Sequence, residues 1–489
     1  MTLLYDSRQI RKIEQWVIAA GTEEYQLMER AGRFVFSILQ QRWPDAQKII
    51  FCTGKGNNAG DAYVAARLAH EHGLPVVIYA VTPCDQLKGS SAKAALACRK
   101  AGVSIIDYHP ELSFDSDVLV DALFGIGLNG VLEEPYVSLI NLINDQNIDI
   151  LAIDVPSGLN ADTGCIEGAA IDADVTVTFI GYKPGLVTLK GPSRCGEVIL
   201  NTLDVPMEIL NKIEPIAEFT EWERIQKVFP RRMRDAHKGD YGHVLVIGGD
   251  YGMGGAVRMA AEGALRVGAG LVSVATRPEH VPVVSSSRPE IMCHQVGEPC
   301  ELIPLLEKVS VIVIGPGLGR TAWAEGLMQL VLEAPHPKLL DADALNLLSQ
   351  RPSYSDRWVL TPHPGESARL LHCSCQELQL DRFDSLRELQ KKYGGVVVLK
   401  GAGTLVKGKA DRIKVCRAGN PGMATGGMGD ILSGIIGGLM AQGLDLLTAA
   451  EIGVYVHARA GDLAVAEGGE RGLLATDVLA YLRPLVNPN

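Results

Sequence analysis

The feature that most constrains the fold is a repeating unit: a short, almost wholly apolar run ends in glycine or aspartate and is followed by a stretch of helical length. Runs rich in valine, isoleucine and leucine without polar alternation are typical of parallel strands covered on both faces. Six such runs occupy the first half, at 48–54, 76–81, 118–125, 150–158, 175–181 and 197–203. We therefore predict a doubly wound α/β domain, with helices at 7–42, 62–72 and 91–101.

The same rhythm resumes in the second half after an interruption. A charged, proline-bounded stretch at 214–242 contains no comparable run, and we predict that it holds a linker and the first helix of another domain. The boundary near 217 gives domains of 1–216 and 217–489. Strands are predicted at 243–249, 271–277, 309–319, 338–345, 357–366 and 396–408, with an antiparallel edge strand at 412–419 and helices at 255–267 and 430–442. The second domain is therefore also predicted to be α/β.

The composition excludes several functional classes. Lys and Arg number 46 and Asp and Glu 57, a net charge of −11, whereas nonspecific nucleic-acid binding needs a basic face. The longest run without a charged residue, 431–444, is shorter than a membrane-spanning helix. The 10 cysteines form no CxxC pair and no zinc-like spacing. We expect a cytoplasmic homo-oligomer that has neither nucleic acid nor a membrane as a partner.

Polar residues follow three of the predicted strands in the first domain. The segment GKGNNAGDA, from Gly54, opens a helix whose free N–H groups favour phosphate. Asp121 and Asp154 end two further runs, and the carboxyl ends of parallel strands converge on one ligand crevice. Oxygen atoms of Asn58, Asp121 and Ser157 then suit one hard cation, with Asp154 facing the substrate. The alternative is that these side chains only cap turns and a helix.

These segments resemble the NAD(P)H-hydrate epimerase domain over essentially all of residues 1–216. The motifs are LMERAG (27–32), GKGNNAGDA (54–62), VDALFGIGLNG (120–130), AIDVPSGLNADTG (152–164) and FIGYKPGL (179–186). The family usually has GNNGGDG where this chain has GNNAGDA. The resemblance implies a Rossmann-like fold, a potassium ion at Asn58, Asp121 and Ser157, and a catalytic Asp154. It implies substrate contacts at Asn57, Asn58, Ala59, Gly60, Asp61, Gly125, Ile126, Gly127, Leu128, Asn129, Gly130, Val131 and Asp154.

The strongest motif of the second domain is NPGMATGGMGD, which runs from Asn420 to Asp430 ahead of an apolar helix. Its glycines and the helix N-terminus offer a site for an anion such as a phosphoryl group in transfer. Asp430 is placed to accept a proton from an attacking hydroxyl. Alternatively, Asp430 is only the N-cap of the helix. The sequence GxxxxGK[ST] is absent, which excludes a P-loop.

Residues 218–489 are similar to the ADP-dependent NAD(P)H-hydrate dehydratases of the ribokinase-like superfamily. Supporting motifs are HKGDYGHVLVIGGDYGMGGA (237–256), GPGLG (315–319), DADAL (341–345), TPHPGE (361–366) and KGAGT (400–404). The resemblance implies a ribokinase-like α/β fold and Mg²⁺ that accompanies ADP or ATP. It implies nucleotide contacts by Lys400, Gly401, Ala402, Gly403, Thr404 and Gly429, and hydrate contacts by Ala256, Gly319, His363 and Asp430. For His363, a structural role between two prolines stays open.

The two resemblances together imply one bifunctional repair enzyme for damaged nicotinamide cofactors. The first domain would interconvert the R and S hydrates of NAD(P)H at C6. The second would dehydrate the S form back to NAD(P)H, with Asp430 as base and ADP giving AMP and phosphate. The alternative is a ribokinase-like small-molecule kinase whose N-terminal domain only binds a ligand.

Overall fold

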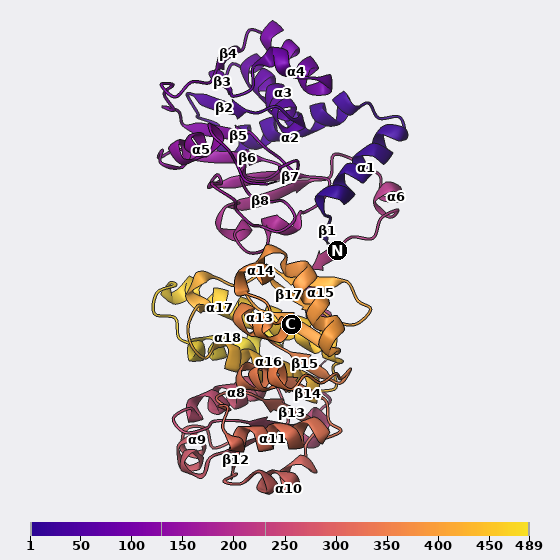
Figure 1. The fold of residues 1–489 in the computed structure, drawn as a ribbon, viewed down its shortest axis with the longest axis vertical. Helices are drawn as coiled ribbons and strands as arrows, with labels where there is room; N and C mark the ends of the chain where they lie inside the picture. The colour runs from indigo at the N-terminus through magenta and orange to yellow at the C-terminus, as the bar shows by residue number, and fades with distance from the viewer. Residues whose placement is uncertain (1, 129, 230, 488–489) are drawn as a thin grey trace. The chain divides into compact units, whose positions relative to one another are not determined.

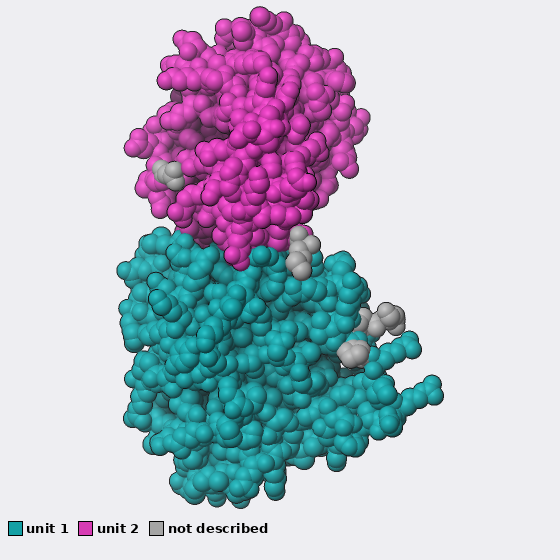
Figure 2. Space-filling model, turned by 90° about the vertical axis from the view of Figure 1, so that its right-hand side faces the viewer, with its two compact units in different colours: residues 1, 218–489 teal, residues 2–217 magenta. Residues whose placement is uncertain are grey.

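The computed structural model describes residues 2–128, 130–229 and 231–487. They form two compact units, residues 2–217 and residues 218–489, coloured separately in Figure 2. Each unit has its own sheet and its own hydrophobic core, and the α/β class predicted for both halves is confirmed. Within the described residues, no helix combines the length and apolar character needed to cross a membrane.

The first unit contains a seven-stranded sheet in the order β4-β3-β2-β5-β6-β7-β8, and every pairing is parallel. The central strands β2, β5 and β7 are buried along their whole length, as their apolar runs predict. The seven strands are β2 (Ile49–Thr53), β3 (Val76–Ala80), β4 (Ser104–Asp107), β5 (Val118–Ala122), β6 (Asp149–Ile153), β7 (Val175–Phe179) and β8 (Glu197–Asn201), and the short β1 (Leu3–Leu4) is not part of this sheet.

Helices cover both faces of this sheet. α2, α3 and α4 pack side by side and share one core cluster with α1, whereas α5 belongs to the cluster on the opposite face. The helices are α1 (Ser7–Ala19), α2 (Glu24–Arg42), α3 (Asn57–Glu71), α4 (Gly89–Lys100), α5 (Tyr136–Asn144) and α6 (Met207–Leu210). The helical prediction for 7–42 is confirmed with one interruption: α1 ends before Gly21, whose φ of +107° is left-handed, and α2 starts with a capping box at Glu23.

The strand order of the first unit reverses between β2 and β5. In open parallel sheets, ligands bind at such a switch point, beyond the carboxyl ends of the strands. The loop that leads from β2 into α3 and the loop that follows β5 both lie there. The topology therefore brings the glycine-rich segment at Gly54 beside the loop after Asp121, as the pattern of strand ends predicts.

The second unit contains a mixed sheet in the order β9-β18-β17-β16-β15-β14-β13-β10-β11-β12. The pairings from β12 through β10 to β16 are parallel, and those of β17 with β16 and with β18 are antiparallel. The strands are β9 (Ala217–Phe219), β10 (His243–Ile247), β11 (Leu271–Thr276), β12 (Met292–Gln295), β13 (Val311–Ile314), β14 (Lys338–Leu340), β15 (Trp358–Leu360), β16 (Val396–Leu399), β17 (Thr404–Lys407) and β18 (Ile413–Cys416).

Four strand predictions for this sheet differ from the structure. The runs 338–345 and 357–366 each hold a three-residue strand followed by the start of a helix, at Ala342 and at Pro364. The run 396–408 is a hairpin of β16 and β17, because left-handed glycines at 401 and 403 turn the chain back. The strand at 412–419 is antiparallel, as predicted, yet β9 lies beyond it, so β18 is not the edge of the sheet. The strand order again reverses, here between β10 and β13.

Helices also cover both faces of the second sheet (Figure 1). Side chains of α8, α16, α17 and α18 form one core cluster with alternate residues of the strands. The helices are α7 (Trp222–Ile225), α8 (Gly254–Arg266), α9 (Val281–Ser287), α10 (Ile303–Leu306), α11 (Ala322–Glu333), α12 (Ala342–Gln350), α13 (Pro364–Leu371), α14 (Cys375–Leu380), α15 (Arg382–Tyr393), α16 (Met428–Ala441), α17 (Leu446–Gly468) and α18 (Leu479–Leu485).

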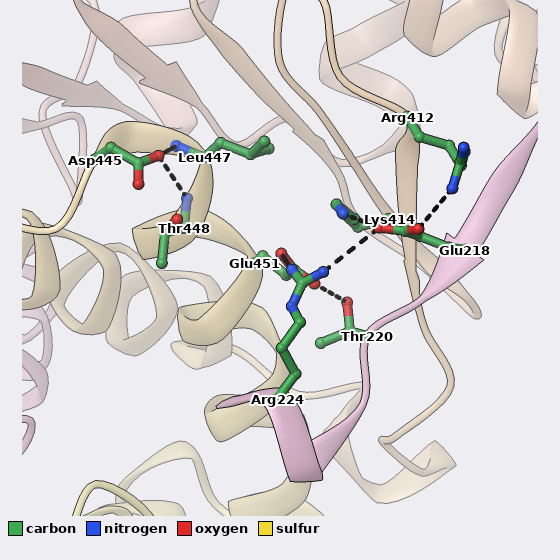
Figure 3. Close-up of polar contacts among 9 residues, drawn as sticks. All are labelled: Glu218, Thr220, Arg224, Arg412, Lys414, Asp445, Leu447, Thr448 and Glu451. Atoms are coloured by element: carbon green, nitrogen blue, oxygen red, sulfur yellow. Dashed lines mark hydrogen bonds and ion pairs between the residues drawn. The ribbon is translucent and has the colours of Figure 1, made fainter. Parts of the chain in front are cut away.

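A buried ion-pair network attaches the start of the second unit to its sheet and to α17. Glu218 on β9 accepts hydrogen bonds from Arg412 at 2.8 Å and from Lys414 on β18 (Figure 3). Glu451 on α17 bonds to Arg224 and accepts a bond from the Thr220 hydroxyl at 3.2 Å. Both carboxylates are nearly inaccessible to solvent. Each has a cationic partner, as burial of a charge requires.

Two candidate active sites

A cavity of about 410 Å³ lies at the switch point of the first unit. Its walls come from one face of α1, from α2, from the start of α3, and from the loops that follow β5, β6 and β7. The expected site residues that line it are Asn57, Asn58, Asp61, Gly125, Ile126, Gly127, Leu128 and Asp154. The topology thus gathers residues from four separate strand ends into one cavity.

Other expected contacts in this unit lie elsewhere. Ala59 and Gly60 are fully buried behind the cavity wall, where a Cβ added to Gly60 would lie 2.3 Å from Met28 Cε. Gly130 does not line the cavity, and Val131 is 68% exposed. Asn129 lies outside the described residues. The methyl group of Ala59 packs into the hydrophobic core, so this departure from the family pattern does not occupy the cavity.

The floor of the cavity holds a buried ion pair. Lys183 Nζ donates to Asp154 Oδ1 at 2.5 Å, to Thr178 Oγ1 at 2.8 Å and to the carbonyl of Phe179 at 2.9 Å. The lysine side chain is fully buried, and Asp154 adopts a left-handed φ of +67°. A non-glycine residue in that conformation costs about 1–3 kcal/mol, a strain typical of functional sites.

Gly125, in the loop that follows β5, lies close to this ion pair. A Cβ built on Gly125 would lie 3.3 Å from Asp154 Oδ2 and 3.4 Å from Asn58 Cγ. The first distance is tighter than an ordinary contact, so a methyl group here would require the Asp154 carboxylate to shift by a few tenths of an ångström, whereas Asn58 lies at ordinary contact distance. Glycine at this position therefore leaves the Asp154 carboxylate undisturbed.

Three side chains next to Asp154 present oxygen atoms that could bind a cation. They belong to Asn58, Asp121 and Ser157. The fully buried Asp121 carboxylate accepts bonds from Ser157 N (2.7 Å), Ser157 Oγ (2.6 Å) and Leu123 N (3.2 Å). Burial raises the pKa of Asp121 to about 6, and these hydrogen bonds oppose the rise. No described Lys or Arg forms an ion pair with Asp121. Asn58 Oδ1 is buried without a hydrogen-bond partner, while its Nδ2 donates to the Phe124 carbonyl.

This arrangement fits a monovalent cation. One carboxylate lacks a counter-charge, and one buried amide oxygen lacks a donor. A hard ion with oxygen ligands would satisfy both. The electrostatic need is for a single positive charge, which suits potassium better than a divalent ion.

Two more carboxyl groups face the cavity with perturbed acidity. Burial, and then the negative charge of Asp154, raise the pKa of Glu14 to about 7, against the opposing effects of Lys183 and Arg11. Burial, Asp154 and Glu14 together raise the pKa of Asp61 well above its usual range. Carboxyl groups with such pKa values cluster at functional sites.

The candidate site of the second unit is built on the carboxyl ends of its parallel strands. Lys400 directly follows β16, Asp341 follows β14, and His363 lies beyond β15, while Asp430 is in the first turn of α16. Lys400 Nζ donates to Asp341 Oδ1 at 2.8 Å and lies 3.9 Å from Glu366 Oε2. Asp341 is 1% exposed, and it also accepts a bond from Ser433 Oγ on α16 at 2.8 Å.

The side chains of this cluster differ in the protonation state that they favour at neutral pH. Burial raises the pKa of Asp430 to about 7, with help from the negative charge of Asp341 and opposed by Lys400. Burial likewise raises the pKa of Glu366 to about 7. Burial alone would lower the pKa of Lys400, yet Asp341 and Glu366 outweigh it and raise that pKa. Lys400 therefore stays protonated at neutral pH, beside the carboxyl groups of Asp430 and Glu366, which gain and lose protons near that pH.

The expected nucleotide residues form one loop and the start of α16. Residues 400–403 connect β16 to β17, which begins at Thr404, and Gly429 lies on α16, where an added Cβ would be 3.4 Å from Lys400 Nζ. Arg382, only 2% exposed, donates to the carbonyl of Ala402 at 2.5 Å and to that of Lys400 at 3.1 Å. Arg382 therefore holds the loop from behind.

The expected hydrate residues lie on neighbouring strand ends. Gly319 has a left-handed φ of +71°, and its N–H donates to Asp343 Oδ2 at 3.0 Å. Ala256 lies in the first turn of α8 next to the loop after β13. His363 caps α13, and its Nδ1 accepts bonds from the N–H groups of Gly365 (3.0 Å) and Glu366 (3.4 Å). Burial lowers the pKa of His363, so the ring stays neutral to a lower pH than an exposed histidine would.

The motifs contain Lys183, Asp341 and Glu366 without assigning them a role, and they omit Glu14 and Arg382 altogether. Lys183 was detectable in principle, because it lies two residues beyond the predicted strand 175–181. Asp341 lies inside the predicted strand 338–345, and only the end of β14 at Leu340 places it at a strand end. Glu14 and Arg382 carry no comparable signal, since each is one charged residue among several on an amphipathic helix.

Comparisons with known proteins match both halves of the chain. The family model described as NAD(P)H-hydrate dehydratase matches residues 244–484, and the model described as YjeF-related protein N-terminus matches residues 24–185. The "Bifunctional NAD(P)H-hydrate repair enzyme Nnr" of Coxiella burnetii is 56% identical and covers 100% of both chains. The Escherichia coli protein of the same name is 43% identical over 96% of this chain and 90% of its own.

Solved structures also resemble part of the chain. The ADP/ATP-dependent NAD(P)H-hydrate dehydratase from Bacillus subtilis, co-crystallized with ATP/Mg²⁺, is 32% identical with a TM-score of 0.52 and covers 55% of this chain and 97% of its own. A ribokinase-like superfamily protein from Enterococcus faecalis is 31% identical with a TM-score of 0.51, over 55% of this chain and 94% of its own.

Proposed function

The chain belongs to the family of bifunctional NAD(P)H-hydrate repair enzymes, and we propose that each of its two units carries one step of that repair. The first unit epimerises the hydrates at C6, and the second dehydrates the S form to NAD(P)H. The observation that carries this assignment is that each unit has its own cluster of buried charges at the carboxyl edge of its own sheet. The residues named for each cluster above all belong to one unit.

The hydrate binds in the cavity of the first unit. The free N–H groups at the start of α3, next to Asn57 and Asn58, bind its phosphates. The nicotinamide ring then lies toward Asp154, whose carboxylate is fixed by Lys183. Asn58, Asp121 and Ser157 would hold potassium, which would supply the positive charge that the buried Asp121 lacks. Because these ligands come from three strand ends, they keep the α3 loop and Asp154 in register.

In the second unit, Asp430 accepts the proton of the C6 hydroxyl. The freed oxygen bonds to the terminal phosphorus of ADP, and the bond from that phosphorus to AMP breaks. The C6–O bond of the phosphate ester then breaks with its electron pair on phosphate, since phosphate is a far better leaving group than hydroxide. Loss of the C5 proton restores the double bond of NAD(P)H.

The cation of Lys400 and the N–H groups at the start of α16 stabilise the charge that develops on the transferring phosphoryl group. The loop 400–404 binds the adenine nucleotide, and Mg²⁺ enters with the nucleotide phosphates. Asp341 keeps Lys400 in position through the 2.8 Å ion pair. ADP is the phosphoryl donor in this proposal, and ATP would serve through the same terminal group.

The test is incubation of the intact chain with a mixture of R and S hydrates, ADP and Mg²⁺. Recovery of the dihydronicotinamide absorbance, with AMP and phosphate formed in equal amounts, supports repair. Accumulation of a stable phosphorylated product, without that absorbance, would instead support a small-molecule kinase with a ligand-binding N-terminal unit.

A further inference from the structure

Glu14 is an acidic side chain in the wall of the first cavity that none of the steps above uses. It lies on α1 between Ile10 and Ile18, one turn away from each, and all three line the cavity. A carboxyl group between two isoleucines loses much of its hydration, which is costly unless the group serves a purpose there. The position therefore calls for an explanation in terms of the ligand.

Helix α1 is fixed to the loops that surround the cavity. The Ser7 N–H and hydroxyl both donate to the Asp162 carboxylate, at 2.7 Å and 2.5 Å, which ties α1 to the loop after β6. Arg11 donates to the carbonyl of Ile126 at 3.1 Å, which ties it to the loop after β5. Glu14, one turn beyond Arg11, is thereby held at a defined place in the wall.

The charges around Glu14 make it a proton-exchanging group. Its negative neighbours are Asp154 and Asp61 in the cavity and Glu24 on α2, and its positive neighbours are Arg11, Lys183 and, in the same wall, Lys55. Lys183 is already bonded to Asp154, and Arg11 to the Ile126 carbonyl. The resulting pKa of about 7 lets Glu14 both give and take a proton at neutral pH.

We propose that Glu14 is the acid–base partner of Asp154 in the epimerisation of the hydrate. The proposal rests on the epimerase function assigned to this cavity. Glu14 donates its proton to the C6 hydroxyl oxygen, and the C6–O bond breaks to release water while the ring nitrogen forms a double bond to C6. A water then bonds to C6 on the opposite face and gives one proton to the Asp154 carboxylate. Return of that proton to Glu14 completes the cycle without any oxidant or reductant.

Inversion requires two groups because the hydroxyl leaves one face of the ring and water arrives at the other. Glu14 projects from a helix and Asp154 from a strand end, so they come from different walls of the cavity. In the reverse direction, the two carboxyl groups exchange roles. Two carboxyl groups that share one proton are a recurrent solution to such acid–base chemistry.

The test is exchange between the R and S hydrates, followed by NMR on the intact chain without ADP, from pH 6 to pH 8. Exchange measured without protein is subtracted. The wild-type rate should fall about tenfold over this range as the shared proton is lost. At pH 6, Glu14→Gln should exchange roughly 10²–10⁴-fold more slowly and lose this pH dependence. Glu14→Asp should retain the dependence with a reduced rate, because a carboxyl group remains.

Glu208→Gln makes the same chemical change on the exposed surface of α6 and should match the wild type. Saturation of exchange with hydrate should occur at a similar concentration in Glu14→Gln and in the wild type, since the ring is still bound. Wild-type exchange by Glu14→Gln would overturn the proposal, as would a slow variant that keeps the wild-type pH profile. An inactive wild-type chain would instead overturn the epimerase function itself.

Discussion

Replacement of Asp430 by asparagine should stop dehydration without unfolding the second unit. The amide keeps the size of the side chain at the start of α16 and can still act as a hydrogen-bond acceptor there. It cannot take up the proton of the C6 hydroxyl. Loss of a general base typically costs about 10²–10⁴-fold in rate. Binding of ADP should change little, because the loop 400–404 and Lys400 are intact.

The structure also gives the pH dependence of this step. The pKa of Asp430 is about 7, so the ionised fraction rises about tenfold between pH 6 and pH 8. Dehydration by the wild type should rise by the same factor over that range. Burial raises the pKa of Glu366 to about 7 as well, so this carboxyl group titrates over the same range.

The raised pKa of Asp430 also predicts that Asp430→Asn, although inactive, is more stable than the wild type at high pH. A pKa raised from 3.8 to about 7 corresponds to at most on the order of 4 kcal/mol between the two protonation states. This group favours the folded state at low pH, and the benefit is lost as pH rises through 7. Asparagine never ionises, so Asp430→Asn should unfold at a higher temperature than the wild type at pH 8, and the difference should shrink at pH 5.

The assay measures initial rates of dihydronicotinamide formation from the S hydrate with ADP, beside thermal unfolding at both pH values. Near wild-type turnover in Asp430→Asn would refute the assignment of the base; a role as helix cap is no alternative, because the N-cap of α16 is Gly427 and no described side chain caps the helix. A lower unfolding temperature at pH 8 would refute the electrostatic reasoning.

Three further outcomes are expected. Asp121→Ala should lose epimerisation and keep dehydration. NMR exchange measurements should show that the wild type epimerises faster in potassium than in a bulky organic cation, and an equal rate in both salts would exclude the cation site. Gly125→Ala places a methyl group 3.3 Å from Asp154 Oδ2, so exchange between the R and S hydrates should slow by roughly tenfold or more. An unchanged rate would mean that the loop shifts to accommodate the methyl group. Arg382→Gln should raise the KM for ADP several-fold with a smaller change in kcat, because it frees the nucleotide loop; an unaltered KM removes this positioning role.

The strand ends of this protein could be predicted from the sequence because burial on both faces makes each strand a continuous apolar run. Asp121 and Asp154 stand out at the ends of such runs, and parallel strands bring their carboxyl ends to one edge. Asp430 stands out for a related reason, since four glycines of the segment 420–430 precede an apolar helix. The residues with the clearest local signals were therefore placed at the sites.

Other parts of the sites depend on contacts that no local pattern contains. The ion pair of Lys400 with Asp341 joins residues 59 positions apart, and Lys183 in a GYKPG turn has the appearance of a surface lysine until the fold buries it. Glu14 follows the amphipathic pattern of α1, in which a charged residue usually faces water. Only the packing of α1 over the cavity shows that this one does not.

The central claim is that the first unit of this chain produces the S epimer that the second unit consumes. The direct measurement is chiral chromatography of an R and S hydrate mixture over time, with ADP and Mg²⁺, for the intact chain and for the fragment 218–489. The intact chain should convert both epimers. The fragment should consume the S form and then proceed only at the rate of spontaneous epimerisation, until residues 2–217 are added. Complete conversion by the fragment alone at the rate of the intact chain would contradict the account.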